Sequence, residues 1–146
     1  MISHVFLGAA DFERALGFWG PVAEALGWQA RFVERGRPWA GWQSVPGPRP
    51  LLLIGAPFDG GAHVPGNGQM LAFDLPTRGQ VDGVWALALA RGGRCEGPPG
   101  LRPQYHAHYY GAYFRDTEGN KLGVVCHGAP AAGGADTAGA PGAEAA

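Results

Sequence analysis

The sequence predicts an α+β fold made of two βαβββ modules, because one pattern of elements occurs twice. Alternating apolar segments typical of strands and one amphipathic helix follow each other in the same order in both halves of the chain. Seven residues separate the strand residue His4 from the helix cap Asp11, and seven separate Met70 from Thr77. In both halves the glycine that ends the helix follows its cap by 16 residues, so the halves overlay at an offset of 66.

The first half begins with a strand at residues 2–9, in which apolar side chains alternate between two faces. Asp11 fits an N-cap, the apolar positions after it recur at helical spacing, and Gly27 ends the helix in a left-handed conformation. Apolar stretches separated by Gly and Pro turns then predict three further strands, at residues 29–34, 39–44 and 51–55.

The second half repeats this plan. A strand at residues 68–76 leads to Thr77, and Gln80 three residues later gives the spacing of a capping box. The helix that follows ends at a pair of glycines, Gly92 and Gly93. The rest of the module is predicted as a short strand at 94–96, a long loop at 97–109, and two strands on either side of the acidic turn 115–120.

Composition excludes two classes of partner. The 146 residues carry a formal net charge of −1 and no basic stripe, so no nucleic acid is expected as a partner. The longest apolar run, residues 51–54, is too short to span a bilayer, and the N-terminus lacks the segments of a signal peptide. We therefore expect no membrane association and a cytoplasmic location. Two cysteines without CxxC spacing indicate reduced thiols, which agrees with that compartment.

The two modules are interpreted as a single domain. This domain is expected to cover residues 1–128, with modules at about 1–60 and 66–127. Residues 129–146 are rich in Ala and Gly and contain no large apolar side chain that could offset the entropy of ordering. They are expected to form a flexible tail.

Three short segments resemble those of a known family. They are the early histidine in "SHV", the "AF" that follows Met70, and "YFRDTEGNKL" with its acidic turn. Together with the repeated βαβββ plan, they make residues 1–127 resemble the vicinal oxygen chelate superfamily, which includes glyoxalase I, extradiol dioxygenases and bleomycin-resistance proteins. The resemblance implies a glyoxalase/bleomycin resistance-like fold, in which the modules form a curled mixed sheet with a concave pocket. It also implies a homodimer.

The resemblance further implies a metal site with ligands on the first and last strand of each module. Carried over to this sequence, the implied positions fall on His4, Met70, Gly123 and the apolar stretch 51–55, so only His4 retains a ligand. Thioether is a poor ligand for hard cations, and glycine has no side chain to offer. We therefore expect no metal and no other cofactor.

Other histidines leave an alternative open. His106 and His108 are two residues apart and point the same way on an extended segment, and His127 shares a strand face with Gly123. They are candidates for a rebuilt site that holds a divalent metal or moves protons, because imidazole titrates near neutral pH. The other interpretation makes them hydrogen-bonding residues around the pocket. The sequence assigns no catalytic residue.

Aromatic side chains dominate the predicted pocket lining. Trp39 and Trp42 lie on opposite faces of one strand, so one of them enters the pocket and the other packs behind it. Arg37 and Arg102, in neighbouring loops, could meet an anionic group of the ligand, but a loop arginine is more often solvated, so neither is counted among the lining residues. The predicted lining residues are His4, Phe6, Trp39, Trp42, Gln43, Met70, His106, His108, Tyr109 and Tyr113.

An aromatic pocket with an incomplete metal site predicts a small organic molecule as the partner. We expect a protein that binds or sequesters such a compound. The alternative is an enzyme of glyoxalase, lyase or dioxygenase type that uses a remodelled metal site or a histidine-based site. Turnover of a bound compound would distinguish the enzyme from the binding protein.

Overall fold

The computed structural model describes residues 1–130, which form two compact units. The first unit comprises residues 1–67 together with the turn 117–120. The second comprises residues 68–116 and the described chain from Lys121 onward. The flexible tail that the sequence predicts lies, apart from its first two residues, outside the described part of the chain.

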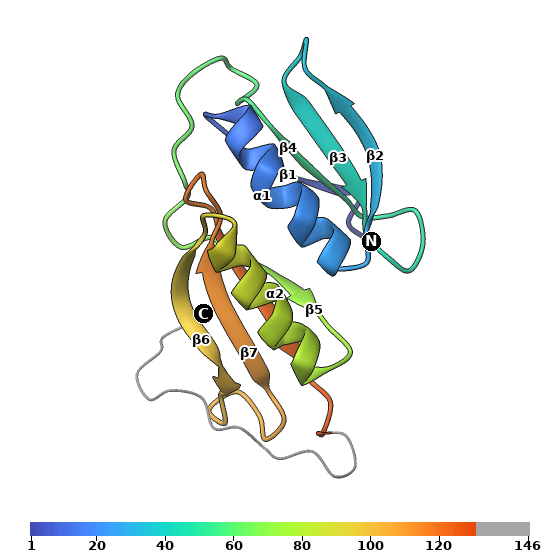
Figure 1. Cartoon of the computed structure of the whole chain (residues 1–146), viewed down its shortest axis with the longest axis vertical. Helices are drawn as coiled ribbons and strands as arrows, with labels where there is room; N and C mark the ends of the chain where they lie inside the picture. Colours follow the sequence, from blue (N-terminus) through green and yellow to red (C-terminus); the bar gives the residue numbers. More distant parts are fainter. Residues whose placement is uncertain (131–146) are drawn as a thin grey trace. The chain divides into compact units, whose positions relative to one another are not determined.

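The first unit contains four strands and one helix (Figure 1). Their bounds are β1 His4–Gly8, α1 Phe12–Ala25, β2 Gln29–Glu34, β3 Trp39–Gln43 and β4 Leu51–Gly55. The sheet order is β1-β4-β3-β2, with β1 parallel to β4 and the other neighbours antiparallel. This is the βαβββ plan that the sequence predicts.

The second unit repeats that topology. Its elements are β5 Leu71–Asp74, α2 Arg78–Ala90, β6 Arg94–Leu101, β7 Tyr110–Arg115 and β8 Lys121–Cys126. The sheet order is β5-β8-β7-β6, again with the first and last strand parallel. Val5 pairs with Leu52 in the first unit, and Leu71, at the offset of 66 from Val5, pairs with Leu122 in the second. Leu122 follows Leu52 by 70 residues, so the offset of 66 relates the first strands and not the last ones.

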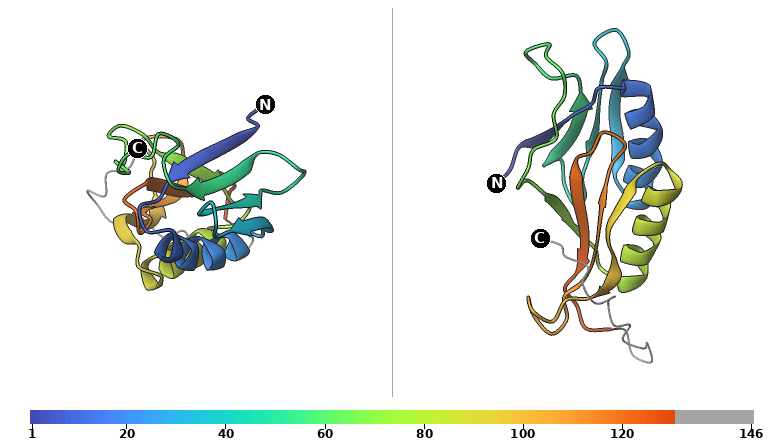
Figure 2. Two further views of the ribbon diagram at one scale, coloured as in Figure 1. Left: turned by 90° about the horizontal axis from the view of Figure 1, so that it is seen from above. Right: turned by 90° about the vertical axis from the view of Figure 1, so that its left-hand side faces the viewer.

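In each unit the helix covers one face of its own sheet (Figure 2). In the first unit Trp42 and Ile54 of the sheet are buried, as are Phe18 and Trp19 of α1, which packs against β3 and β4. In the second unit the Tyr110 hydroxyl donates to Asp82 Oδ1 of α2 at 2.6 Å, which marks that side as the helix side. We call the opposite side of each sheet its helix-free face.

Sequence features at the helix ends act as expected. Asp11 caps α1, because its side chain accepts a hydrogen bond from the Arg14 N–H at 3.1 Å. Gly27, just after α1, has a φ of 77°, the left-handed conformation that glycine adopts without steric cost. Thr77 and Gln80 form both hydrogen bonds of a capping box at α2.

The sequence prediction for β6 was too short. Strand β6 continues through residues 97–101, which were expected to belong to a loop. Its pairing with β7 has two irregularities, and the second, between Gly97 and Gly100, spans the two prolines. Proline is tolerated in this place because β6 is an edge strand, where an N–H is not needed for pairing on the outer side.

The acidic turn between β7 and β8 belongs to the first unit. Glu118 Oε2 accepts hydrogen bonds from the N–H groups of Ala10 at 2.8 Å and Asp11 at 3.4 Å, immediately before α1. Asn120 Nδ2 donates to the carbonyl of Gly8 at 3.0 Å. The turn therefore braces the connection between β1 and α1.

In the part of the chain that the structure covers, no helix has the length and apolar character required to cross a membrane.

Candidate functional site

The predicted pocket residues fall into both units, and each group is described within its own unit. His4, Phe6, Trp39, Trp42 and Gln43 belong to the first unit. Those in the second unit are Met70, His106, His108, Tyr109 and Tyr113, together with the weaker metal candidate His127.

The helix-free face of the first unit carries an aromatic surface. Phe6 is 42% exposed, and the rings of Phe32 and Trp39 lie 4.6 Å apart. Trp39 Nε1 donates to Glu34 at 2.9 Å. Trp42 points the other way and is buried between the sheet and α1. Of the two tryptophans that the sequence left as alternatives, Trp39 is therefore the one on the helix-free face.

The polar residues predicted for this face are held by local contacts. Gln43 accepts a hydrogen bond from Arg31 at 2.9 Å and donates one to the carbonyl of Gly47 at 3.0 Å. His4 is exposed, and its Nδ1 lies 3.1 Å from the hydroxyl of the adjacent Ser3. Gln43 is thus held by protein partners, whereas His4 is exposed.

A histidine that sequence reasoning missed lies on the same face. The His63 ring packs directly on Gly8, where an added Cβ would lie 2.8 Å from His63 Cε1 and closer still to Nδ1. His63 Nε2 is buried and has no hydrogen-bond partner among residues 1–130. The signal in the sequence was indirect: Gly8 shares the strand face of His4 and Phe6, and its lack of a side chain leaves room for a ring.

In the second unit, Tyr113 covers the position that the family resemblance assigns to a metal-binding glutamate. Tyr113 and Gly123 are register partners, and a Cβ on Gly123 would lie 3.1 Å from Tyr113 Cδ1. Tyr113 is fully buried, and its hydroxyl lies 2.6 Å from that of Tyr109. Burial, and then the hydrogen bond with Tyr109, raise the pKa of Tyr113 above its ordinary value, so this phenol stays protonated.

Two of the three candidate histidines meet. His106 Nε2 and His127 Nδ1 are 2.8 Å apart, and His106 Nδ1 accepts a hydrogen bond from the backbone N–H of His108 at 3.1 Å. With Nδ1 occupied as an acceptor, neutral His106 carries its proton on Nε2 and donates it to His127. The His108 side chain does not join the pair and is exposed.

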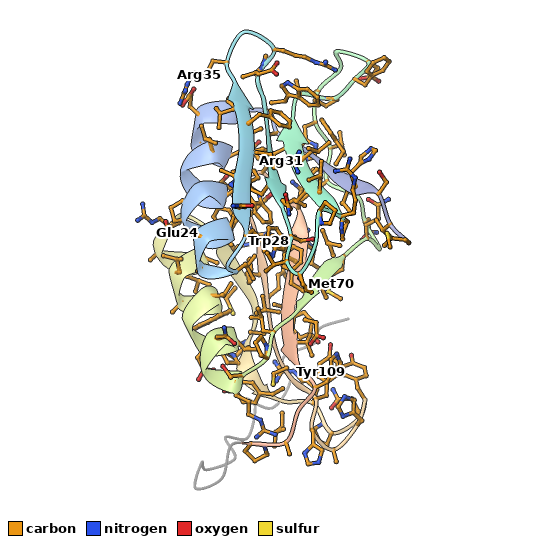
Figure 3. All side chains as sticks on the ribbon, turned by 90° about the vertical axis from the view of Figure 1, so that its right-hand side faces the viewer. Glu24, Trp28, Arg31, Arg35, Met70 and Tyr109 are labelled. Carbon is orange, nitrogen blue, oxygen red and sulfur yellow. The ribbon has the colours of Figure 1, made fainter. Side chains whose placement is uncertain are left out.

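These residues form what we call the tyrosine–histidine cluster. Its members are Tyr105, His106, Tyr109, Tyr113 and His127. The Tyr109 ring is central: it lies 4.8 Å from Tyr105, and its edge-to-face contacts with His106 and His127 are 5.6 and 5.4 Å between ring centroids. Figure 3 labels Tyr109, which lies at the end of the loop that leads into β7, and Met70, which precedes β5.

Arg102 contradicts its interpretation as a solvated side chain. It is only 3% exposed, and its guanidinium lies 5.8 Å from the centre of the Tyr113 ring. Nη2 donates to the carbonyl of Pro98 at 2.7 Å, and Nη1 to that of Leu101 at 3.4 Å. The sequence offers no periodic signal for burial in an irregular loop, which is why the burial of Arg102 was not predicted.

The described residues do not fit the metal site that the resemblance implies. Gly123 lies beneath Tyr113, and Leu53 on the helix-free side of β4 offers no ligand. Within residues 1–130, no group of three or more His, Cys, Asp or Glu side chains is arranged to hold a metal ion. His106 and His127 supply two nitrogens and no carboxylate.

Comparisons with known proteins agree with the fold. The sequence model of the Glyoxalase/Bleomycin resistance protein/Dioxygenase superfamily matches residues 1–124. A glyoxalase/bleomycin resistance protein from Albidiferax ferrireducens is 31% identical, with a TM-score of 0.76 over 86% of this chain and 98% of that chain. A glyoxalase-related enzyme from Fulvimarina pelagi is 22% identical, with a TM-score of 0.67 and 96% of both chains covered.

A third solved structure shows the same fold at lower identity. It is a glyoxalase/bleomycin resistance protein/dioxygenase family enzyme from Burkholderia phytofirmans, 19% identical, with a TM-score of 0.66 over 86% of this chain and 97% of that one. No curated protein matches the chain. The family model covers most of the sequence, and both units have the repeated βαβββ topology. The chain therefore belongs to the glyoxalase/bleomycin resistance protein/dioxygenase superfamily.

Proposed function

We propose that this protein binds a small aromatic compound without a metal ion, on the helix-free face of the second unit. The observation that carries the proposal is the position of Tyr113, whose ring lies over Gly123 where the resemblance implies a metal-binding carboxylate. A phenol in hydrogen-bond contact with Tyr109 takes the place of a charged ligand. The site then favours recognition of an organic molecule over activation by a metal.

The tyrosine–histidine cluster has the chemistry for such recognition. Aromatic rings offer flat apolar area together with a polar edge, and ring pairs in edge-to-face geometry are favourable. Tyr109 and Tyr113 each have one hydroxyl proton. One of these protons forms the hydrogen bond between the two hydroxyls, and the other is free to donate to a ligand. Tyr105 is 43% exposed, so the cluster is accessible from its outer side. Phe6 and Trp39 supply a second aromatic surface in the first unit.

A ligand screen tests the proposal. Purified protein is screened by thermal shift against aromatic metabolites and antibiotics, because a ligand that binds only the native state raises the melting temperature. Hits are measured by titration calorimetry on wild type, Tyr109→Phe and Trp42→Phe. We expect weaker binding in Tyr109→Phe, which loses a hydroxyl of the cluster, and little change in Trp42→Phe, whose ring is buried against α1.

Metal content is measured on the same preparations after dialysis. We expect well under one divalent ion per chain and the same affinity for hits before and after chelation. Stoichiometric metal whose removal abolishes ligand binding would contradict the proposal. So would hits that bind wild type and Tyr109→Phe equally.

A second candidate function, an enzyme with a histidine-based site, is favoured by the His106–His127 hydrogen bond. In this pair neutral His106 donates to His127, which leaves an exposed imidazole that can exchange a proton with a bound compound. The test is turnover of the screening hits followed by NMR. Turnover that is lost in His127→Gln while ligand affinity is retained would support the enzyme.

A further inference from the structure

We propose that Arg102 is an anion anchor, and that the ligands of the tyrosine–histidine cluster are therefore aromatic anions such as carboxylates. The inference rests on the proposed binding function and names its ligand class. As a loop arginine, Arg102 could have been either solvated or in contact with an anionic ligand, and its burial distinguishes the two.

The first observation is a buried charge without a counter-charge. Arg102 is 3% exposed, and its hydrogen-bond acceptors among residues 1–130 are the backbone carbonyls of Pro98 and Leu101. No carboxylate in this part of the chain pairs with it. Arginine is rarely buried so completely unless it is paired, because removing the charge from water is costly and only an opposite charge at close range offsets that cost.

The second observation is the number of unused donors. A guanidinium has five N–H groups, and two of them donate to the carbonyls at 2.7 and 3.4 Å. The Nε–H is buried and has no acceptor among the described residues. The remaining donors form part of the planar fork that binds a carboxylate through two parallel hydrogen bonds.

The third observation is what surrounds the guanidinium. Its carbon lies 5.8 Å from the centre of the Tyr113 ring, and the Tyr113 hydroxyl is in contact with that of Tyr109. The phenol pair has one hydroxyl proton that is free to donate. Burial raises the pKa of Tyr113, and the positive charge of Arg102 has a smaller, opposite effect that lowers it. Cation and phenol donors therefore favour negative charge at the same place, and the rings of Tyr105 and Tyr109 offer apolar area beside it.

Entry of an anion requires movement of the loop 102–109. Three backbone hydrogen bonds lie within it, from the Arg102 N–H to the Tyr109 carbonyl at 2.8 Å, from the Tyr105 N–H to the Arg102 carbonyl at 3.0 Å and from the Tyr109 N–H to the His106 carbonyl at 3.2 Å. The exposed His106–His127 hydrogen bond joins the loop to the end of β8 and would break on opening. Residues 103–108 are exposed, so the loop buries little surface that opening would have to uncover. The same short loop thus carries both the anchor and the outer rings of the cluster.

The experiment uses benzoate as the probe and benzyl alcohol as its neutral counterpart. Binding to the full chain is measured by titration calorimetry and thermal shift at fixed ionic strength, on wild type, Arg102→Met, Arg102→Lys and the matched control Arg91→Met. Arg91 is an exposed arginine at the end of α2. We expect benzoate to bind wild type and Arg91→Met equally, to bind Arg102→Met at least about tenfold more weakly, and to bind Arg102→Lys with intermediate affinity.

Benzyl alcohol should bind wild type and Arg102→Met alike, so that the ratio of benzoate to benzyl alcohol affinity collapses in the variant. If Arg102→Met fails to fold, the same ratio in Arg102→Lys decides. Benzoate affinity unchanged by either Arg102 substitution would overturn the anchor. Equal binding of benzoate and benzyl alcohol to wild type, both weakened by Tyr109→Phe, would overturn the anchor while leaving the proposed aromatic binding intact.

Discussion

Two glycines determine which rings can lie on the helix-free faces. Gly8 leaves room for the His63 ring in the first unit, and Gly123 leaves room for Tyr113 in the second. Each ring occupies space that a side chain on the neighbouring strand would otherwise fill. The absence of a side chain at Gly123 is therefore linked to packing as well as to the missing metal ligand.

Replacing Gly8 with alanine should destabilise the protein, because the new methyl group would collide with the His63 ring. We expect a loss of about 1–3 kcal/mol of unfolding free energy in urea denaturation. The matched control is Gly17→Ala, an exposed glycine inside α1 with no atom within 4 Å of the added methyl. That change should instead stabilise by about 0.5–1 kcal/mol. A Gly8→Ala variant as stable as wild type would show that the His63 ring is not held on Gly8.

Gly123→Glu, which restores the carboxylate that the resemblance implies, should not create a metal site. The added Cβ would lie 3.1 Å from Tyr113 Cδ1 and 3.3 Å from Ala72 Cβ, in a buried place where a carboxylate is costly. We expect a loss of about 2 kcal/mol or more in unfolding free energy and no gain in bound zinc or nickel. Tight stoichiometric metal in this variant would contradict the packing argument.

Sequence reasoning predicted which strand residues share a face and did not predict the contacts of side chains on loops. Alternation along β7 predicted that Tyr109 and Tyr113 share a face, and their hydroxyls are 2.6 Å apart. Arg102 and His63 lie outside regular strands and helices, where no period reports the direction of a side chain. The contact between His106 and His127 also depends on the loop path before β7, which spacing along the chain does not fix.

At the scale of elements, the acidic turn that carries the family resemblance acts as a structural brace. Its Glu118 accepts two backbone N–H groups just before α1, and Arg14 of α1 donates to the Thr117 carbonyl at 2.6 Å. The contacts of this motif hold β1 and α1 together. Its role in the described structure is therefore to support the fold.

Glu118→Ala should destabilise the first unit by about 1–3 kcal/mol, because two backbone donors beside α1 lose a charged acceptor. Hydrogen exchange should show faster exchange at the amides of Ala10 and Asp11. The control is Glu13→Ala: Glu13 lies in the first turn of α1, and among residues 1–130 its carboxylate contacts the exposed Arg35, so its removal should leave stability close to wild type. Equal effects of the two substitutions would refute the bracing role.

The pairing of β6 with β7 predicts a dependence of stability on pH. Arg115 Nε donates to Glu96 Oε1 at 2.6 Å, and this hydrogen bond lowers the pKa of Glu96 in the folded protein. The unfolded chain therefore takes up a proton at higher pH than the folded chain does. The stabilisation is fully present above the unfolded pKa of about 4.3 and is lost as pH falls through the lower folded value.

The free energy of unfolding, measured by urea denaturation at a series of pH values from 6 down to 3, checks this dependence. Glu96→Gln should show a flatter fall in unfolding free energy at the acidic end than wild type. Glu24→Gln, at an exposed residue of α1, should keep the wild-type slope. Parallel curves for all three proteins would argue against the contribution of Glu96.

Helix ends were predictable because capping is a local chemical pattern, as the Thr77–Gln80 box shows. The extent of β6 was not, because its prolines favour a loop when the sequence is considered alone. Their tolerance depends on the strand lying at the edge of its sheet, which is a property of the assembled sheet.

For the whole molecule, the repeat in the sequence was enough to predict two units of the same topology. Both sheets place the first strand of the unit beside the last, in parallel, and the offset of 66 holds for the first strands. Equivalent architecture did not bring equivalent chemistry. The helix-free face of the first unit carries Phe6 and Trp39, whereas that of the second carries the tyrosine–histidine cluster, because the side chains on the repeated frame differ.

The full chain is predicted to form a two-fold dimer, as the family resemblance implies. The edge strand β1 supports this prediction: Ile2 and Phe6, on or just before it, are 62% and 42% exposed, and an apolar edge strand is a surface that a second chain can cover. Light scattering at micromolar concentration should give twice the 15.2 kDa mass of the full chain, and a chain without residues 129–146 should give twice its own smaller mass. Ile2→Glu should shift the protein toward the monomer, because dimerisation would bury the new charge. Val64→Glu, at a residue that is 79% exposed on the loop after β4, should not. A monomer at micromolar concentration would contradict the dimer, and a dimer unaffected by Ile2→Glu would remove β1 from the interface.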